Sequence, residues 1–341
     1  MNRIYFVTLL LSFLVLLQSC AVIEKHPPQR KDPLIGKIID GRSGSPVHFE
    51  DLIGAVRSKD VIYLSEKHDN KDHHLFQQQV IRALVQEGLT PVVGFEFFSM
   101  EDTPDLLNFI DAGRVAHSKK AEQIIENDLR KKLGWDTQSD EMWGFYFDLL
   151  SLAKELKLNV AGIDMPTTLK RRITRKGIDG LHPLEKNAVF STGLSDAPYK
   201  EHMLDVFKAV HCGMGHGRMQ ERLYDTWVAR NDKMALSITQ LVQLKKGPVV
   251  VIVGGGHTEY GLGVINRVAA IDPSVRQVNV ALKEISIHPA PLSDYLSPLT
   301  LDGHGTLAPA DYLRFSQRAS YEDPCVKFKE QLQKMKKRAK D

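Results

Sequence analysis

The sequence is poor in cysteine and nearly balanced in charge. Its 341 residues include three cysteines, and 45 basic against 42 acidic residues leave a formal net charge of +3. A general nucleic-acid binder carries a larger positive excess, so we expect no nucleic-acid partner. Neither Cys-x-x-Cys nor Cys-x-x-Cys-His occurs, which excludes a thioredoxin-type redox site and covalently attached c-type haem. Cys212 and Cys325 remain as a pair that an oxidising compartment could join, although the sequence cannot place them together.

The motifs of several enzyme classes are missing as well. A dinucleotide-binding fingerprint that starts at Gly254 needs a glycine at position 259, where Glu259 stands, and no Gly-Lys-Ser/Thr follows. The absence of Gly-x-Ser-x-Gly argues against a serine hydrolase, and the absence of His-Glu-x-x-His leaves no zinc signature. Nucleotide binding and serine hydrolysis are therefore set aside.

The long apolar run of the sequence, Ile4 to Leu17, lies at the N-terminus behind Arg3. Its fourteen residues are fewer than the roughly 20 that a membrane-spanning helix needs, but they suit the core of a secretory signal. The run ends at Leu17-Gln18-Ser19-Cys20, which resembles the bacterial lipobox, whose cysteine is lipidated and becomes the first residue of the mature protein. We expect a lipoprotein signal peptide at 1–19 and lipidation of Cys20, with a plain secretory signal as the alternative.

Charged residues are frequent in the segments at both ends of the body. Residues 20–33 are predicted to form a flexible tether, because three prolines stand among charges there. Ala21 follows the cysteine in place of the aspartate that retains lipoproteins in the inner membrane, so we expect a lipid anchor in the cell envelope, at the outer membrane. Residues 327–341 hold seven Lys and Arg against two acids. We interpret this basic tail as a solvated helix end, with a lipid- or polyanion-binding role as the alternative.

Short apolar runs alternate with helical patterns through the body of the chain. The runs suit strands buried on both faces of a parallel sheet, and they lie at 61–64, 91–95, 159–163 and 248–253. Apolar residues recur at helical spacing from Asp72 to Gly88, over 141–156 and over 218–244. This alternation predicts a Rossmann-like α/β fold, with a mostly parallel sheet flanked by helices and long helical insertions. We place one domain over 34–290, including an edge strand at 277–287, and a C-terminal extension with the basic tail over 291–341.

Polar side chains follow the predicted strands. Glu66 and His68 come after the first strand, Glu96 after the second, and His257 after the fourth, behind Gly254-Gly255-Gly256. Ligands of open α/β sheets bind at the carboxyl ends of the strands, so we expect these four side chains to share one site. Glu66 and His68 lie two residues apart, which in a strand places them on one face. The glycines before His257 let the backbone approach a ligand closely.

Two groups of side chains suggest metal chemistry. Imidazole and carboxylate ligands suit zinc or manganese, so one hypothesis is a metal-dependent hydrolase with Glu66, His68, Glu96 and His257 as metal ligands or general base. The alternative for each of them is structural, since such side chains also cap helices and bind loops. A second group at 211–216 offers two imidazoles, a thiol and a thioether, but we interpret it as a helix-ending glycine loop.

Five blocks of the sequence, in the expected order behind the lipobox, resemble the ChaN-type haem-binding lipoproteins. The blocks are Asp32 to Ile38, Val61 to Gln79 with its Glu-x-His-Asp-Asn-x-x-His-His pattern, Gly94 to Phe98, Gln220 to Ala235, and Gly254 to Gly263. The resemblance runs over most of 32–270. It implies a Rossmann-like α/β fold, a surface lipoprotein, and haem handling linked to iron acquisition.

The wider superfamily resembles the TraB and Tiki proteins and the erythromycin esterases, which carry paired Gly-x-x-His motifs with glutamates. Gly254-x-x-His257 fits that pattern, whereas Ser65 and Lys67 stand where glycine and a small residue are usual in the first motif. A lysine ammonium beside Glu66 competes with a divalent cation. This departure weakens the metal hypothesis more than it weakens haem binding.

Haem binding is the favoured function, chiefly through the resemblance. Haem needs flat apolar contact, basic groups for its propionates, and an axial ligand such as His, Tyr or Met. We predict that the cofactor-binding residues are Tyr260 as axial ligand, His257 as supporting ligand, and His68, Glu66 and Glu96. A homodimer stays open, because the sequence does not show the oligomeric state. A structural or partner-binding lipoprotein that holds no ligand is a further alternative.

Overall fold

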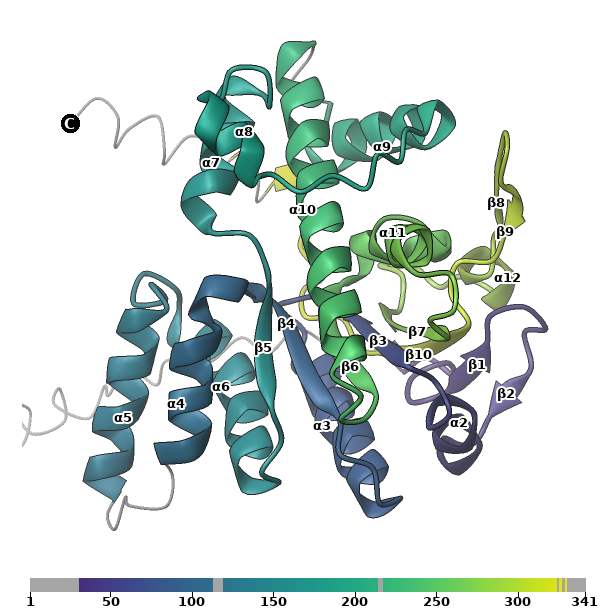
Figure 1. Cartoon of the computed structure of the whole chain (residues 1–341). Helices are drawn as coiled ribbons and strands as arrows, with labels where there is room; N and C mark the ends of the chain where they lie inside the picture. The colour runs from purple at the N-terminus through teal and green to yellow at the C-terminus, as the bar shows by residue number, and fades with distance from the viewer. Residues whose placement is uncertain (1–30, 113–118, 214–216, 324, 327–328, 330–341) are drawn as a thin grey trace, which may run out of the picture. The chain divides into compact units, whose positions relative to one another are not determined.

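The computed structural model describes residues 31–112, 119–213, 217–323, 325–326 and 329 (Figure 1). Its centre is an eight-stranded sheet with the order β2-β1-β10-β7-β3-β6-β4-β5. The strands from β10 to β5 run parallel, and β1 pairs antiparallel with both β10 and β2. The strands of this sheet are β1 (Ile38–Asp40), β2 (Pro46–Val47), β3 (Val61–Glu66), β4 (Val92–Ser99), β5 (Val160–Asp164), β6 (Val249–Gly254), β7 (Gln277–Glu284) and β10 (Tyr312–Ser316).

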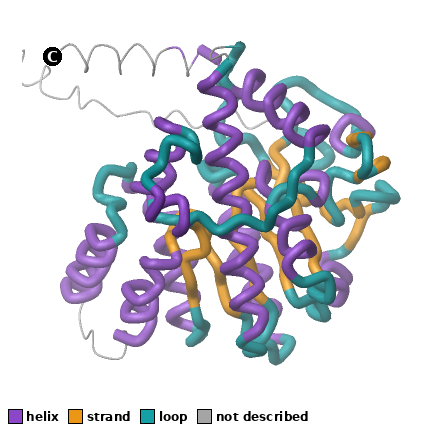
Figure 2. Tube along the Cα trace, turned by 45° about the horizontal axis from the view of Figure 1, so that its top comes forward, coloured by secondary structure: helices purple, strands orange, loops and turns teal. Residues whose placement is uncertain are grey.

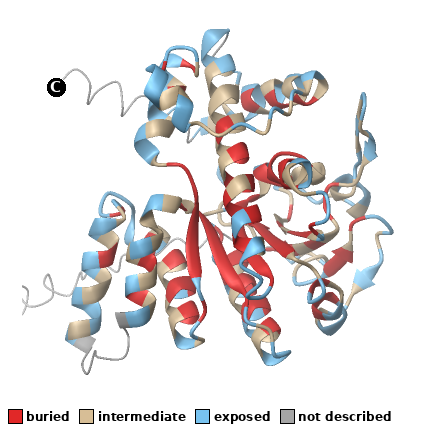
Figure 3. Ribbon diagram, viewed as in Figure 1, coloured by how far each residue is buried: buried red, intermediate tan, exposed pale blue. Residues whose placement is uncertain are grey.

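The central strands are apolar on both faces because helices cover both. In β3, Ile62 and Leu64 face one helical layer while Val61 and Tyr63 face the other, as the two-residue repeat of a strand requires. The residues of β6 from 249 to 253 are all β-branched, which suits a buried pleated surface. Figure 3 shows these strands as buried along their length.

Helices from the first half of the chain cover one face of the sheet. Their apolar side chains share one core cluster with those of β3, β4 and β6. These helices are α2 (Phe49–Val56), α3 (Lys71–Gln86), α4 (Thr103–Ala112), α5 (Lys119–Lys132) and α6 (Asp140–Glu155), and the short 3-10 helix η2 (Met100–Asp102) joins β4 to α4. The side chain of Asn70 accepts hydrogen bonds from the amides of Asp72 and His73. This cap starts α3 directly behind the end of β3.

The opposite face is covered by α10 (Arg218–Gln243) and α11 (Val264–Ile271), which pack on Val61, Tyr63 and Val251. The C-terminal half of α10 supplies the core residues Met234, Ala235, Ile238 and Leu241. Its N-terminal half extends beyond the sheet, and three helices gather round it (Figures 1 and 2). They are α7 (Thr167–Lys176), α8 (Pro183–Ala188) and α9 (Ala197–Val210).

The last part of the chain returns to the sheet. After β7, α12 (Leu292–Tyr295) leads into a hairpin of β8 (Leu299–Leu301) and β9 (Gly305–Leu307), and β10 then enters the sheet between β1 and β7. The segment 291–341, set apart in the sequence as an extension, thus contributes a strand to the central sheet. The edge position predicted for 277–287 is wrong, because β10 pairs beyond β7 and covers its outer side.

The predicted α/β class, with a mostly parallel sheet flanked by helices, is confirmed. The helical patterns at 72–88, 141–156 and 218–244 correspond to α3, α6 and α10. The predicted signal peptide, Cys20 and most of the tether lie outside the described residues, as does most of the basic tail. Within the described part, no helix is both long enough and apolar enough to cross a membrane.

A disulfide joins Cys212, two residues beyond α9, to Cys325 near the C-terminus. Cys212 and Gly213 both have positive φ angles, as expected where a helix ends in a tight turn. With its thiol in a disulfide, Cys212 is no metal ligand, and residues 211–213 end α9 as the interpretation of a helix-ending loop predicts. Met214 and His216 of that group lie outside the described residues.

Replacing both cysteines by serine is expected to lower the free energy of unfolding by about 2–4 kcal/mol, because the crosslink restricts the unfolded chain over a long loop. The two residues are 113 positions apart in the sequence. Urea denaturation of the oxidised wild type and the double variant measures the difference. Reductant is the control, since it should destabilise the wild type and leave the double variant unchanged. Equal denaturation midpoints of the two oxidised proteins would contradict the expectation.

Candidate functional site

The carboxyl ends of β3, β6 and β4 border a cavity of about 530 Å³. These strands are neighbours in the sheet, so side chains far apart in the sequence meet at this edge. Glu66, His68, Glu96 and His257, which the sequence predicts to share one site, all line this cavity. We call it the strand-end cavity.

Glu66 orients the imidazole of His68 from inside the protein. Its Oε1 atom lies 3.1 Å from His68 Nδ1 and accepts a hydrogen bond of 2.5 Å from the Tyr146 hydroxyl, while Gln77 Nε2 donates to Oε2 at 2.7 Å. The Glu66 side chain is buried, whereas 37% of the His68 side chain is exposed. Burial alone would lower the pKa of His68, but the bond to Glu66 and the charges of Glu96 and Glu66 outweigh it and raise the pKa. His68 is therefore an oriented imidazole suited to proton exchange.

Arg230 of α10 ties two strand-end carboxylates together. Its Nη2 atom donates to Glu96 Oε1 at 2.5 Å, and its Nε atom donates to Asp164 Oδ2 at 2.9 Å. The amide of Gly254 donates to Glu96 Oε2 at 2.6 Å. Burial raises the pKa of Glu96, but the neighbouring His257 and Arg230 outweigh burial and hold this pKa well below its usual range. Glu96 is therefore an ionised carboxylate inside the protein.

His257 is buried in the loop behind β6, in the short 3-10 helix η3 (Gly255–His257). Its Nδ1 atom lies 2.7 Å from Asn231 Oδ1, and its Nε2 atom lies 3.2 Å from Glu96 Oε1. The Trp227 indole stacks on its ring, with the two ring centroids 3.9 Å apart. Both ring nitrogens therefore face groups of the protein itself.

A side chain at Gly254 would displace the imidazole of His68, which lies against the Gly254 backbone. A Cβ atom at this position would come within 2.7 Å of His68 Cε1 and 3.3 Å of Glu96 Oε2. The sequence predicts a close backbone approach at this glycine run. In the structure, the group that lies this close to the Gly254 backbone is the side chain of His68.

The donor set of this cavity does not favour a metal ion. Among the described residues, no three or more His, Cys, Asp or Glu side chains are arranged to hold one. The Arg230 guanidinium already pairs with Glu96, and the Tyr146 hydroxyl donates to Glu66. Lys67 is not the competing cation that the sequence predicts, because its ammonium pairs with other acids. The metal-dependent hydrolase hypothesis therefore gains no support, since protein donors take the positions that a cation would need.

Replacing His68 by glutamine is expected to remove a pH-dependent part of the stability. The folded-state pKa of His68 is raised above the 6.5 that is usual for an unfolded chain, so its contribution is complete below that pH and is lost as the pH rises through the folded-state pKa. Between about pH 6 and about pH 8, the wild type should lose stability relative to His68→Gln. Urea unfolding of both proteins across this range measures the effect. Parallel pH profiles would show that the Glu66–His68 contact contributes nothing.

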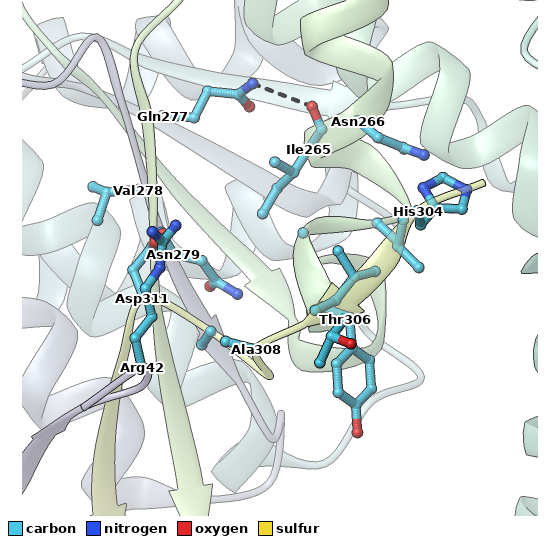
Figure 4. A pocket seen from close by; sticks show the side chains of 15 residues that line it. Arg42, Ile265, Asn266, Gln277, Val278, Asn279, His304, Thr306, Ala308 and Asp311 are labelled. Atoms are coloured by element: carbon cyan, nitrogen blue, oxygen red, sulfur yellow. Dashed lines mark hydrogen bonds and ion pairs between the residues drawn. The ribbon is translucent and has the colours of Figure 1, made fainter. Parts of the chain in front are cut away.

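Tyr260 lies on a second cavity, of about 650 Å³. Figure 4 shows Arg42 and Asp311 on one side of it, and His304 and Thr306 on the other. Tyr260 belongs to the short 3-10 helix η4 (Glu259–Gly261) and has φ 61° and ψ 17°, a left-handed conformation that side chains other than glycine rarely adopt. A strained tyrosine beside a cavity is a candidate functional residue.

Tyr260 packs against an apolar cluster between α9, α10 and the β8–β9 hairpin, which we call the Tyr260 cluster. The ring of His202 faces Tyr260 edge-on, with the centroids 6.1 Å apart. Burial, and then the charge of Glu259, raise the pKa of the Tyr260 hydroxyl. Tyr260 and His257, close in the sequence, thus line two different cavities, although Trp227 packs on both sides of this boundary. The cluster's buried members are Tyr199, Met203, Phe207 and Leu262, and its half-buried members include Tyr224, Trp227, Leu299, Leu301 and Leu307.

Sequence reasoning missed Arg230 and Trp227, which line the strand-end cavity, and Tyr146, which donates a hydrogen bond to Glu66. All three lie on predicted helices, and a helical pattern does not show which polar residue faces the sheet. One signal was present in α10, because Asn231 and Asp232 are polar and yet occupy buried helix positions next to Arg230. Polar residues on the buried side of a helix indicate a partner there.

Comparisons with known proteins agree with this architecture. A family model described as haem-binding uptake, Tiki superfamily, ChaN, matches residues 52–268, which is more than half of the chain. The solved structure of ChaN from Campylobacter jejuni, described as showing cofacial haem binding, has a TM-score of 0.58 and 20% sequence identity, over 81% of this chain and 95% of that chain. The erythromycin esterase EreC in its open conformation has a TM-score of 0.47 and 11% identity, over 84% of this chain and 99% of that chain. No curated protein matches the sequence.

The likeness to the Campylobacter protein shows a shared fold. The family match covers β3, β4, β5 and β6 and the helices that bear the strand-end cavity, and it extends to Tyr260. It also confirms the resemblance that five sequence blocks indicate. This chain therefore belongs to the haem-binding uptake family of the Tiki superfamily, the ChaN family.

Proposed function

We propose that this protein binds haem through Tyr260 and serves in haem or iron acquisition at the cell envelope. The observation that carries the proposal is the strained Tyr260, which packs against the apolar side chains of the Tyr260 cluster and lines a cavity. Haem needs flat apolar contact, an axial ligand and cations for its propionates. The Tyr260 cluster offers the first two. Membership of the haem-binding uptake family supports the same function.

Two cations lie close to this surface. Arg42 lines the same cavity as Tyr260, and its side chain is largely exposed. The Lys200 ammonium lies over the ring of Tyr224 in the Tyr260 cluster, 5.6 Å from the ring centroid. Arg42 pairs with Asp311 and Lys200 with Glu221, but both pairs are exposed, so exchanging the acid for a haem propionate costs little. When bound, haem supplies the iron chemistry, while the residues of this chain orient the macrocycle and shield it from water.

The strand-end cavity suits a porphyrin less well, because ionised and hydrogen-bonded side chains line it. The predicted part of His257, His68, Glu66 and Glu96 in haem binding stays a prediction. Hemin titration of His68→Gln checks it, because His68 lines the strand-end cavity and is no member of the Tyr260 cluster. If haem binds through the Tyr260 cluster, this variant should keep the wild-type affinity. A large loss of affinity would instead indicate that haem binds in the strand-end cavity.

Hemin titration of residues 21–341, followed by visible absorbance, tests the proposed function. We expect a saturable, stoichiometric shift of the Soret band. Bovine albumin is the control for non-specific association of hemin with protein. A featureless curve that does not saturate would refute haem binding by this chain.

We further propose that Cys20 carries the lipid that holds the protein at the outer membrane. The Cys212–Cys325 disulfide supports a place outside the cytoplasm, because such bonds persist in oxidising compartments. Fractionation of cells on a density gradient should find the wild type with outer membranes and Cys20→Ala in the soluble fraction. Equal distribution of the two proteins would refute the anchor. The homodimer also stays a proposal, and size-exclusion chromatography with and without hemin tests it.

A further inference from the structure

The C-terminal ends of α7 and α9 lie against the N-terminal half of α10 (Figures 1 and 2). In α7, the carbonyl of Arg175 accepts a hydrogen bond of 2.6 Å from Arg222 Nη1 of α10. In the last turn of α9, the ring of Phe207 packs edge-on against Trp227 of α10, with the centroids 5.8 Å apart. The ends of α7 and α9 and the start of α10 therefore form one continuous surface.

Five exposed cations on this surface have no carboxylate partner within the described part of the chain. The nearby acids are already paired, because Glu221 binds Lys200 and Asp179 binds Lys186. Cations without such partners produce a positive potential that attracts anions. We call these five residues the cationic patch, and they are Arg171, Arg175 and Lys176 of α7, Lys208 of α9, and Arg218 of α10.

Exposed apolar side chains lie beside these cations. Val210 ends α9, and Met219 belongs to the first turn of α10. Val326 follows Cys325, which the disulfide holds next to Cys212 behind α9. Between 50% and 60% of each of the three apolar residues is exposed. Exposed apolar side chains that gather in one place mark an interaction surface, so we expect a partner that offers apolar contact as well as negative charge.

We infer that the cationic patch and the apolar side chains beside it dock on a bilayer of anionic phospholipids. Lipid phosphates supply the negative charge, and the boundary between headgroups and acyl chains accepts the side chains of Val210, Met219 and Val326. The basic tail predicted at 327–341 begins directly behind Val326, so seven more Lys and Arg start from the same surface. A soluble polyanion would use the cations and leave the apolar side chains in water.

The lipid that we propose at Cys20 gives the chain a reason to lie near a bilayer. Docking adds an orientation to that anchor, because the ends of α7 and α9 and the start of α10 then face the membrane. The inference does not depend on haem binding.

Reversing two charges of the patch tests the docking. The chain from Ala21 to Asp341 carries no lipid, so its binding to vesicles reports the protein surface alone. It should sediment with vesicles of phosphatidylcholine and phosphatidylglycerol, less so at high salt, and not with vesicles of phosphatidylcholine alone. Arg175→Glu combined with Lys176→Glu should lower the affinity for the anionic vesicles about tenfold or more.

The other end of α10 provides the matched control. Lys245 and Lys246 are also neighbouring exposed cations just behind a helix. Lys245→Glu combined with Lys246→Glu changes the net charge by the same amount and should change the affinity less than about twofold. Circular dichroism reports whether each variant is folded. If the reversal at Arg175 and Lys176 prevents folding, Arg175→Gln combined with Lys176→Gln replaces it.

An apolar side chain distinguishes a bilayer from a soluble polyanion. Met219→Ser should lower the affinity for anionic vesicles about fivefold, because the methionine no longer enters the acyl boundary. Leu244→Ser is the control, since Leu244 is 57% exposed beyond the far end of α10 and should have little effect. Binding to heparin, a soluble polyanion, should not respond to Met219→Ser.

Three outcomes would overturn the inference. Equal binding of the two double charge reversals to anionic vesicles would show that the cationic patch is not the docking surface. Binding to heparin without binding to anionic vesicles would assign the surface to a soluble polyanion. Equal affinity of Met219→Ser and the wild type for anionic vesicles would refute insertion into the bilayer. The vesicle experiments contain no hemin and no lipidated protein, so their failure is distinguishable from failure of the proposed haem binding or of the Cys20 anchor.

Discussion

Arg230→Met is expected to lower the free energy of unfolding by about 3–5 kcal/mol, because it removes one partner of a buried charge network. Arg230 pairs with Glu96 and Asp164, which are 3% and 0% exposed. Methionine keeps much of the apolar volume and supplies no charge. In the variant, Asp164 still pairs with Lys170 at 2.8 Å. Glu96 has lost its guanidinium partner, so its buried charge accounts for most of the destabilisation. Equilibrium urea denaturation near neutral pH measures the loss.

An exposed ion pair provides the control for this substitution. Arg82 binds Glu155 through two hydrogen bonds at the protein surface, and Arg82→Met should change stability little. Adding Glu96→Gln to Arg230→Met should recover part of the loss, because the unpaired buried charge is then gone. If Arg230→Met unfolds like Arg82→Met, the network around Glu96 does not stabilise the fold.

The convergence of the strand-end residues could be predicted because it follows from topology alone. Parallel strands end at one edge, so Glu66, Glu96 and the loop before His257 had to meet there once the runs of apolar residues were identified as strands. What each side chain does at that edge could not be predicted. Glu96 faces Arg230 rather than a metal ion, and the partner comes from a helix 134 residues further along the chain.

The sequence grouped Tyr260 with His257 because only two residues separate them. The local backbone conformation directs the two side chains to different cavities. His257 turns inward against Trp227 and Asn231. Tyr260 has a left-handed backbone conformation and lines another cavity. Spacing in a sequence carries no information on such a turn when the residue is not glycine. The packing of the β8–β9 hairpin beside Tyr260 was equally hidden, since the hairpin lies in 291–341, where the resemblance contributes little.

Tyr260→Phe is expected to weaken hemin binding about 100-fold, which corresponds to about 2.8 kcal/mol of binding free energy. Phenylalanine keeps the aromatic surface of the cluster and removes only the oxygen that would bind iron, so the loss reports ligation rather than packing. The visible absorbance bands of any remaining complex should also change. Tyr312→Phe is the control, because Tyr312 is a half-buried tyrosine of β10 that packs in the main core.

The pH dependence of binding distinguishes ligation from simple adsorption. Burial raises the pKa of Tyr260, so the free phenol holds its proton at neutral pH. A metal ligand must give up that proton, and the apparent hemin affinity should therefore rise with pH in the wild type. Tyr260→Phe should lack this rise, while Tyr312→Phe should retain it. If the wild type and Tyr260→Phe show the same affinity and the same pH profile, Tyr260 is not the ligand. The strained η4 turn would then need another explanation.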